Sequence, residues 1–113
     1  MDAFQFLRAE HRKASDLLKR LRDAVNAAER ERLFTELKQE LESDATVERE
    51  YFYPPLLERE VTADIAGGGI HDLNRLHELL ERLEALPREG GEWHACLDQL
   101  QQAMDEHRHK EEE

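Results

Sequence analysis

Ionisable side chains occupy positions that should be apolar in three segments of this chain. Near the C-terminus, apolar residues recur at steps of three and four residues, and the next two steps fall on His107 and Glu111. His11 interrupts a similar series near the N-terminus, and Asp44 and Glu48 interrupt a third. A buried unpaired charge costs several kcal/mol, so such positions require a compensating partner. Three interrupted series predict one shared partner, and a metal ion is the obvious candidate.

The residue types suit a transition metal. Asp44 with Glu48, and His107 with Glu111, are separated by four residues, so each pair can present two ligands on one helix face. A further histidine, His77, lies beside the apolar stripe of its own segment. Imidazole nitrogens combined with carboxylates suit iron, manganese or zinc better than calcium. Two carboxylates and at least three imidazoles exceed what one tetrahedral zinc ion requires, so the sequence predicts a dinuclear site.

The segments that must position these residues have helical periodicity. Charged residues make up 38% of the 113 residues, with only 5 Gly and 3 Pro, which is a helical composition. Apolar spacing predicts four amphipathic helices, at about 2–26, 29–53, 70–86 and 92–113. Two short turns connect the first pair and the last pair, which favours an all-α, antiparallel up-down-up-down four-helix bundle. The length fits a single domain spanning residues 1–113.

Proline and glycine mark the predicted breaks. Pro54 and Pro55 are expected to end or kink the second helix. The only long connection follows, with Gly67, Gly68 and Gly69 as its flexible part.

Counting residues places the candidate ligands at one height. A helix rises about 1.5 Å per residue, so His11 and Asp44 each lie roughly 24 Å from the turn near Ala27. His107 lies about 24 Å from the turn near Gly90, and His77 about 20 Å from it. Glu48 and Glu111 lie about 6 Å further along their helices. We therefore expect one ligand layer, at the end away from the short turns, comprising His11, Asp44, Glu48, His77, His107 and Glu111.

With these residues in place, the chain resembles the hemerythrin-like family, the HHE cation-binding domains, over essentially its whole length. The matching positions are His11, Glu48 shortly before Tyr53-Pro54, His77, and His107 followed four residues later by Glu111. The resemblance implies a non-haem centre of two iron ions with an oxo or hydroxo bridge; manganese or zinc are alternatives. It also implies that Glu48 and Glu111 bridge the ions and that the histidines are terminal ligands.

Two positions depart from the family pattern. Asp44 stands where the family has a helix histidine, and Leu73 stands where oxygen carriers have the first histidine of a pair. If Asp44 is a ligand, the additional oxygen donor stabilises the oxidised metal, which favours sensing or redox chemistry over reversible oxygen carriage. If Asp44 is not a ligand, one metal is under-coordinated and the site becomes mononuclear or partly occupied.

We predict a metal-binding protein that binds, senses or reacts with O2, peroxide or nitric oxide. We expect it to act as a binding or sensing protein rather than as a turnover enzyme. The alternative is a helical sensory or interaction module whose metal is structural, mononuclear or absent. A ferritin-like di-iron site would need Glu three residues before its histidines. Asn74 and Met104 occupy those positions, so that class is excluded.

Net charge, the lack of a long apolar run and the single cysteine limit the possible partners and cellular location. The net charge of −11 argues against nucleic acid and anionic membrane surfaces as partners. There is no apolar run of about 20 residues and no signal-peptide pattern at the N-terminus. The single cysteine, Cys96, fits a reducing cytoplasm and is expected in or near the core. Tyr51, one turn beyond Glu48, is expected to face inward as a core residue or a partner of the metals, whereas the remaining histidines are expected at the surface: His71, His94 and His109.

Overall fold

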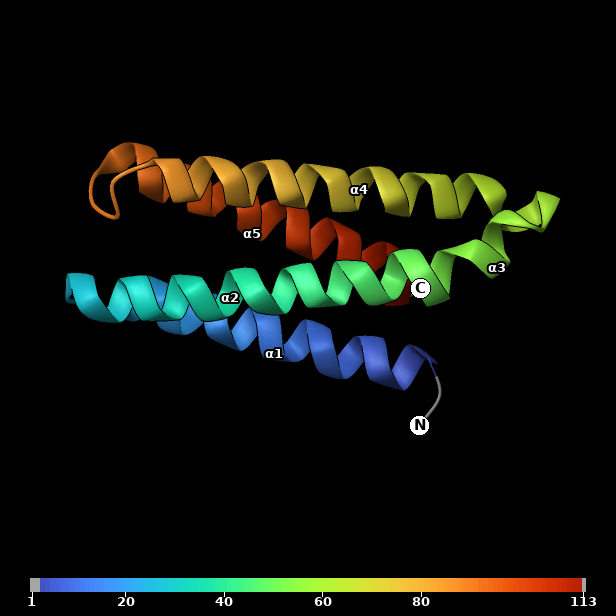
Figure 1. The fold of residues 1–113 in the computed structure, drawn as a ribbon, viewed down its shortest axis with the longest axis horizontal. Helices are drawn as coiled ribbons and strands as arrows, with labels where there is room; N and C mark the ends of the chain where they lie inside the picture. The colour runs from blue at the N-terminus through green and yellow to red at the C-terminus, as the bar shows by residue number, and fades with distance from the viewer. Residues whose placement is uncertain (1–2, 113) are drawn as a thin grey trace.

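The computed structural model describes residues 3–112, and within them all side chains except those of residues 3, 4, 61, 65 and 112. The described part contains no strand, and its long helices are α1 (Ala3–Asp23), α2 (Ala27–Val47), α4 (Glu60–Ala85) and α5 (Gly91–Glu112). A π-helical turn, η1 (Glu48–Phe52), and a short helix, α3 (Tyr53–Leu57), link α2 to α4. Figure 1 shows the long helices running antiparallel in chain order, with α3 and both termini at one end. The predicted all-α four-helix bundle is confirmed.

The two short turns lie at the opposite end from α3 (Figure 1). At the first turn, the side chain of Asn26 accepts a hydrogen bond of 2.8 Å from the backbone N–H of Glu29, which caps α2. At the second, Gly90 adopts a φ of 99°, a left-handed conformation that other residues rarely adopt. Both turns were predicted, although α1 ends at Asp23 rather than near residue 26, and the predicted start at Asp2 lies outside the described residues.

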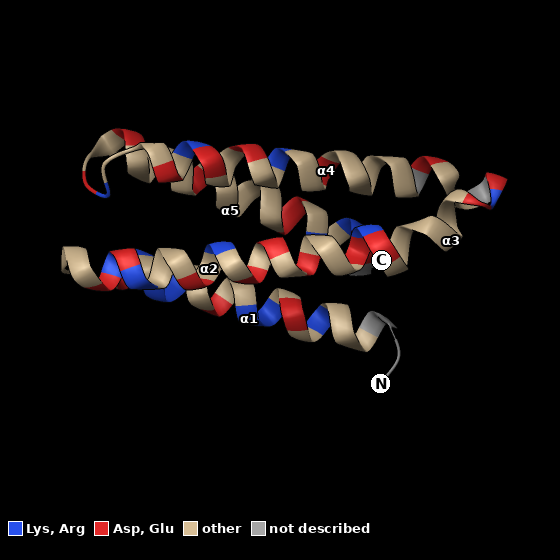
Figure 2. Cartoon of the chain, in the orientation of Figure 1, with Lys and Arg blue, Asp and Glu red and all other residues tan. Residues whose placement is uncertain are grey.

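Leucines from all the long helices form the core. Leu33, Leu37, Leu83, Leu97 and Leu100 have no exposed surface. Burying one such side chain contributes about 2 kcal/mol, so this cluster supplies much of the stability that holds the bundle together. The outer faces carry interleaved acidic and basic residues (Figure 2).

The π-helical turn changes which tyrosine faces inward. A π-turn adds a residue to the helical turn and shifts the register of everything that follows. Tyr51 is therefore 72% exposed, whereas Tyr53 is only 2% exposed, so the expectation that Tyr51 faces inward is wrong. The helical path also continues through Pro54 and Pro55 instead of ending before them, because proline is tolerated in the first turn of a helix such as α3.

The third long helix begins earlier than predicted. Helix α4 starts at Glu60, so the three glycines lie within it and do not form a flexible connection. A Cβ atom at Gly69 would overlap the ring and hydroxyl of Tyr53, whereas Gly67 and Gly68 have open space around them. Packing against the rest of the bundle has overridden the weak helix propensity of glycine.

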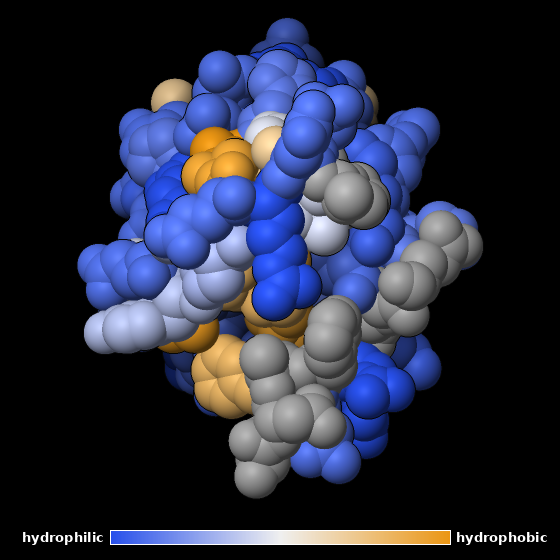
Figure 3. Space-filling model, turned by 90° about the vertical axis from the view of Figure 1, so that its right-hand side faces the viewer, coloured by the Kyte–Doolittle hydropathy of each residue, from blue (hydrophilic) through white to orange (hydrophobic). Residues whose placement is uncertain are grey.

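The end of the bundle that carries α3 has a mainly hydrophilic surface with small hydrophobic patches (Figure 3). No helix in the described part of the chain is long and apolar enough to cross a membrane.

Candidate metal centre

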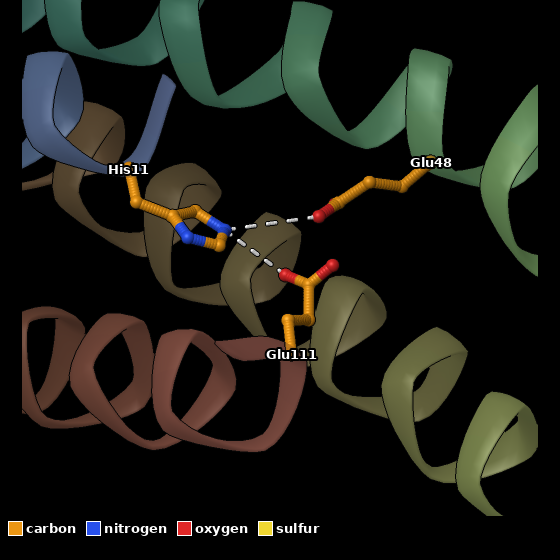
Figure 4. Close-up of side chains that lie close together, drawn as sticks. All are labelled: His11, Glu48 and Glu111. Atoms are coloured by element: carbon orange, nitrogen blue, oxygen red, sulfur yellow. Dashed lines mark hydrogen bonds and ion pairs between the residues drawn. The ribbon is translucent and has the colours of Figure 1, made fainter. Parts of the chain in front are cut away.

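Three ionisable residues are buried at the end of the bundle that carries α3. Glu48 is 2% exposed, His107 4% and Glu111 7%. The side chain of His11, 12% exposed, lies against them. These four residues come from α1, η1 and α5, so three separate elements supply the cluster. Figure 4 shows the side chains of His11, Glu48 and Glu111 pointing toward one another.

Donor atoms of His11, Glu48 and Glu111 all lie within 4.8 Å of one another. Nε2 of His11 lies 3.0 Å from Oε1 of Glu111 and 4.0 Å from Oε1 of Glu48 (Figure 4). Nε2 of His107 lies 2.7 Å from Oε1 of Glu111 and 3.5 Å from Oε1 of Glu48. Ligand atoms about 2.1 Å from a metal ion lie roughly 3–3.5 Å from each other, and two of these four separations fall in that range.

Several buried polar atoms in the cluster have no hydrogen bond to the described residues. They are Nδ1 of His11, Nε2 of His107 and Oε2 of Glu111. Leaving a buried polar group unsatisfied costs about 1–3 kcal/mol. Two imidazoles and two carboxylates are a donor set that iron, manganese or zinc accepts. The residues therefore fit a bound transition-metal ion, which would satisfy Nε2 of His107.

Protons hold the charges in balance when no metal is bound. Burial opposes a charge on His107, but the neighbouring carboxylates of Glu111 and Glu48 outweigh it and raise the pKa of His107 to about 10. Burial, aided by Glu111, raises the pKa of Glu48 to about 8 despite the opposing effect of His107. For Glu111, burial is outweighed by His107 and His11, which hold its pKa well below the usual range. A metal ion would take the place of these protons.

Asp72 lies behind His107, on α4. Its Oδ2 atom is 3.5 Å from Nδ1 of His107 and 3.0 Å from Nζ of Lys110. A carboxylate behind a histidine fixes the orientation of the ring and leaves the other nitrogen free to bind metal. Sequence spacing does not reveal Asp72, because its contact with His107 depends on how α4 packs against α5.

Asp44 lies beside the cluster but belongs to a second group of carboxylates. It is close to Glu10 and Glu40, whose oxygens lie within 4.8 Å of its own. Burial, with a hydrogen bond to Glu10, raises the pKa of Asp44 to about 9. Asp44 also lines a cavity with His11 and Glu48. Its role as a ligand stays a prediction.

His77 does not join the cluster. Its side chain is 55% exposed and its Nε2 lies 3.6 Å from a carboxylate oxygen of Glu81, one turn along α4. Helix α4 instead presents Leu73 and Leu76 to the cavity beside the cluster. Successive residues of a helix are rotated by about 100°, so His77, next to Leu76, points outward. The expectation that His77 lies among the inward-facing ligands is therefore corrected.

The remaining polar candidates lie as expected from the sequence. His71, His94 and His109 are exposed. Cys96 is buried in the core, with its Sγ 3.8 Å from the carbonyl oxygen of Leu79. None of them contributes to the cluster.

An antiparallel four-helix bundle with a buried group of imidazoles and carboxylates at one end defines a helical-bundle class of metal-binding protein. Comparison with protein families gives a match to the hemerythrin HHE cation binding domain over residues 2–113. The chain therefore belongs to the hemerythrin HHE family, as its sequence motifs suggested. Comparisons with curated proteins and with solved structures gave no match.

Proposed function

We propose that this chain holds non-haem iron through His11, Glu48, His107 and Glu111, and that the iron binds or reacts with O2 or a related small oxidant. The observation that carries the proposal is the convergence of four mostly buried donors, with Nε2 of His107 lacking any hydrogen bond to the described residues. Such a group of ionisable residues is costly in a bundle core unless a cation compensates it.

The donor set favours iron. Two histidines with a carboxylate and open coordination positions are the arrangement found in many non-haem Fe(II) proteins. The two carboxylates together balance the charge of a divalent ion. Asp72, 3.5 Å from Nδ1 of His107, would keep that ring oriented toward the ion.

Three of the donors, His11, Glu48 and Glu111, lie within 4.8 Å of one another, which is close enough to share one ion, and Nε2 of His107 lies against both carboxylates. The di-iron centre that the family resemblance implies requires further ligands for a second ion. Asp44 lines the same cavity as His11 and Glu48, so it is the candidate for that role. Helix α4 offers leucines there rather than His77, which makes the site poorer in imidazole than the sequence predicted.

A cavity of about 30 Å³ lies next to the donors. This volume is large enough for a water molecule or a small diatomic molecule. Leu41, Leu73, Leu76 and Met104 form its apolar part. Bound iron would supply an open coordination position and one-electron chemistry, and these side chains would limit the access of water to it.

Metal analysis of protein purified without added metal, followed by anaerobic Fe(II) titration, tests the proposal. We expect at least one iron per chain, and new near-ultraviolet absorption when O2 is admitted. The variant His11→Ala should lose iron, whereas His71→Ala, at an exposed position, should keep it. Titration that saturates with no iron bound contradicts the proposal. Iron that binds but never responds to O2, peroxide or nitric oxide would instead favour a structural metal in a helical interaction module.

A further inference from the structure

Tyr53 is a buried polar residue beside the cluster that the four donors leave without a role. It is the first residue of α3 and is 2% exposed. Its hydroxyl is buried and makes no hydrogen bond to the described residues. Burial and the nearby carboxylates of Glu111 and Glu48 raise its pKa, so the phenol keeps its proton and is a hydrogen-bond donor.

Glu111 supplies the matching acceptor. Its Oε1 atom faces the two histidines, at 3.0 Å from His11 and 2.7 Å from His107. Its Oε2 atom is buried and has no hydrogen bond to the described residues. The Glu111 carboxylate is near enough to the Tyr53 hydroxyl to raise its pKa, so an unpaired buried donor lies near an unpaired buried acceptor. Pairing them would remove two desolvation costs of about 1–3 kcal/mol each.

We propose that Tyr53 is a positioning residue for the metal site, donating a hydrogen bond from its hydroxyl to Oε2 of Glu111 and so holding Oε1 toward the ion. A glutamate has three rotatable side-chain bonds, and fixing them costs entropy that a second hydrogen bond offsets. Partners of this kind, one step removed from the metal, typically change metal affinity by about 10- to 100-fold. The inference rests on the proposed metal-binding function.

Gly69 gives this role structural support. A Cβ atom at residue 69 would overlap the Tyr53 hydroxyl and ring, so only glycine leaves the tyrosine its place. Gly67 and Gly68 on the same helix meet nothing. A glycine within a helix costs about 1 kcal/mol relative to alanine, and at Gly69 the close approach of Tyr53 accounts for that cost.

The test measures the affinity for Fe(II) and Co(II) by competition with a chelator. Tyr53→Phe should weaken both by about tenfold or more. The Co(II) absorption spectrum, which reports the ligand geometry, should change in the same variant. Tyr51→Phe, at an exposed position, is the matched control and should match the wild type. Gly69→Ala should reproduce the loss, whereas Gly68→Ala should not.

The same substitution in a Glu111→Asp variant distinguishes a hydrogen bond from Tyr53 to Glu111 from a role of Tyr53 in core packing. Glu111→Asp shortens the carboxylate and withdraws it from the tyrosine, so adding Tyr53→Phe to Glu111→Asp should cause no further loss of affinity. Equal losses in both backgrounds overturn the proposal, as does a Tyr53→Phe variant that binds metal as the wild type does. A visible iron–phenolate band in the ferric protein that disappears in Tyr53→Phe would make Tyr53 a ligand and also overturns it. If the wild type itself binds no metal, the proposed function fails with it.

Discussion

His107 and Glu111 lie one turn apart on α5, with Nε2 of His107 only 2.7 Å from Oε1 of Glu111. Both side chains are buried at the end of the bundle, and Glu48 lies 3.5 Å from the same imidazole nitrogen. The pair therefore forms part of a charge-balanced group inside a leucine-rich core. Burying these charged side chains lowers the stability of the protein unless a proton or a cation balances the carboxylates. Replacing the pair therefore tests whether a metal ion supplies that balance.

Replacing both members of the pair should remove the metal and leave the fold intact. The double variant His107→Leu/Glu111→Leu removes two ionisable groups from a leucine-rich core. We expect loss of bound iron, measured by metal analysis, and a free energy of unfolding of the metal-free protein that is unchanged or about 1 kcal/mol higher. Urea titration followed by circular dichroism gives this quantity.

Glu111→Leu alone is the comparison for that variant. It leaves His107 with Glu48 but removes its closest partner, so the metal-free protein should lose about 3 kcal/mol. If the metal-free double variant has a lower free energy of unfolding than Glu111→Leu, the buried pair does not destabilise the metal-free protein, which contradicts this prediction.

His77 should be dispensable for metal binding. Because its side chain is 55% exposed and pairs with Glu81, His77→Ala should leave the iron content and the unfolding midpoint unchanged. The matched variant is His71→Ala, on the same helix. Loss of iron in His77→Ala alone would restore the sequence-based assignment and show that α4 rotates when metal binds.

The sequence predicted the bundle because apolar spacing is a strong signal over long helices. It also predicted the cluster around His107, because residues at steps of three and four necessarily share a face. It failed at His77, which borders the apolar stripe, because a rotation of one residue about the axis of α4 decides between ligand and surface. No spacing rule resolves that rotation.

Tyr53 and Asp72 escaped prediction for a different reason. The inward position of Tyr53 depends on the π-helical turn over Glu48–Phe52, which no local sequence pattern announces. From the sequence, Gly69 is expected in a flexible linker. In the structure, it leaves space for the side chain of Tyr53, 16 positions earlier in the chain. Tertiary contacts of this kind override local propensity and become visible only in the assembled bundle.

The metal-free protein should lose stability as the pH rises from about 6.5 to 10. The folded-state pKa of His107, about 10, exceeds its unfolded value of about 6.5, so its stabilising contribution is complete below pH 6.5 and is lost as the pH approaches 10. The raised pKa of Glu48, about 8, acts in the same direction, because ionising it in the folded protein is unfavourable. Urea titrations at several pH values would measure the effect. Glu48→Gln, which cannot ionise, should show a shallower loss, and stability that rises between pH 7 and 9.5 would contradict the assignment.

Metal binding should release protons in a pH-dependent number. At pH 7 the raised pKa values keep a proton on His107 and largely on Glu48, and a metal ion must displace both. We expect release of roughly two protons per ion near pH 6.5 and roughly one near pH 9, where Glu48 has already ionised. Zn(II) or anaerobic Fe(II) added to weakly buffered protein with an indicator dye measures the release. Engagement of Asp44, whose pKa is about 9, would add a further proton at the lower pH, and Asp44→Asn removes that contribution. Binding at pH 7 with no proton release would exclude His107 from the coordination shell.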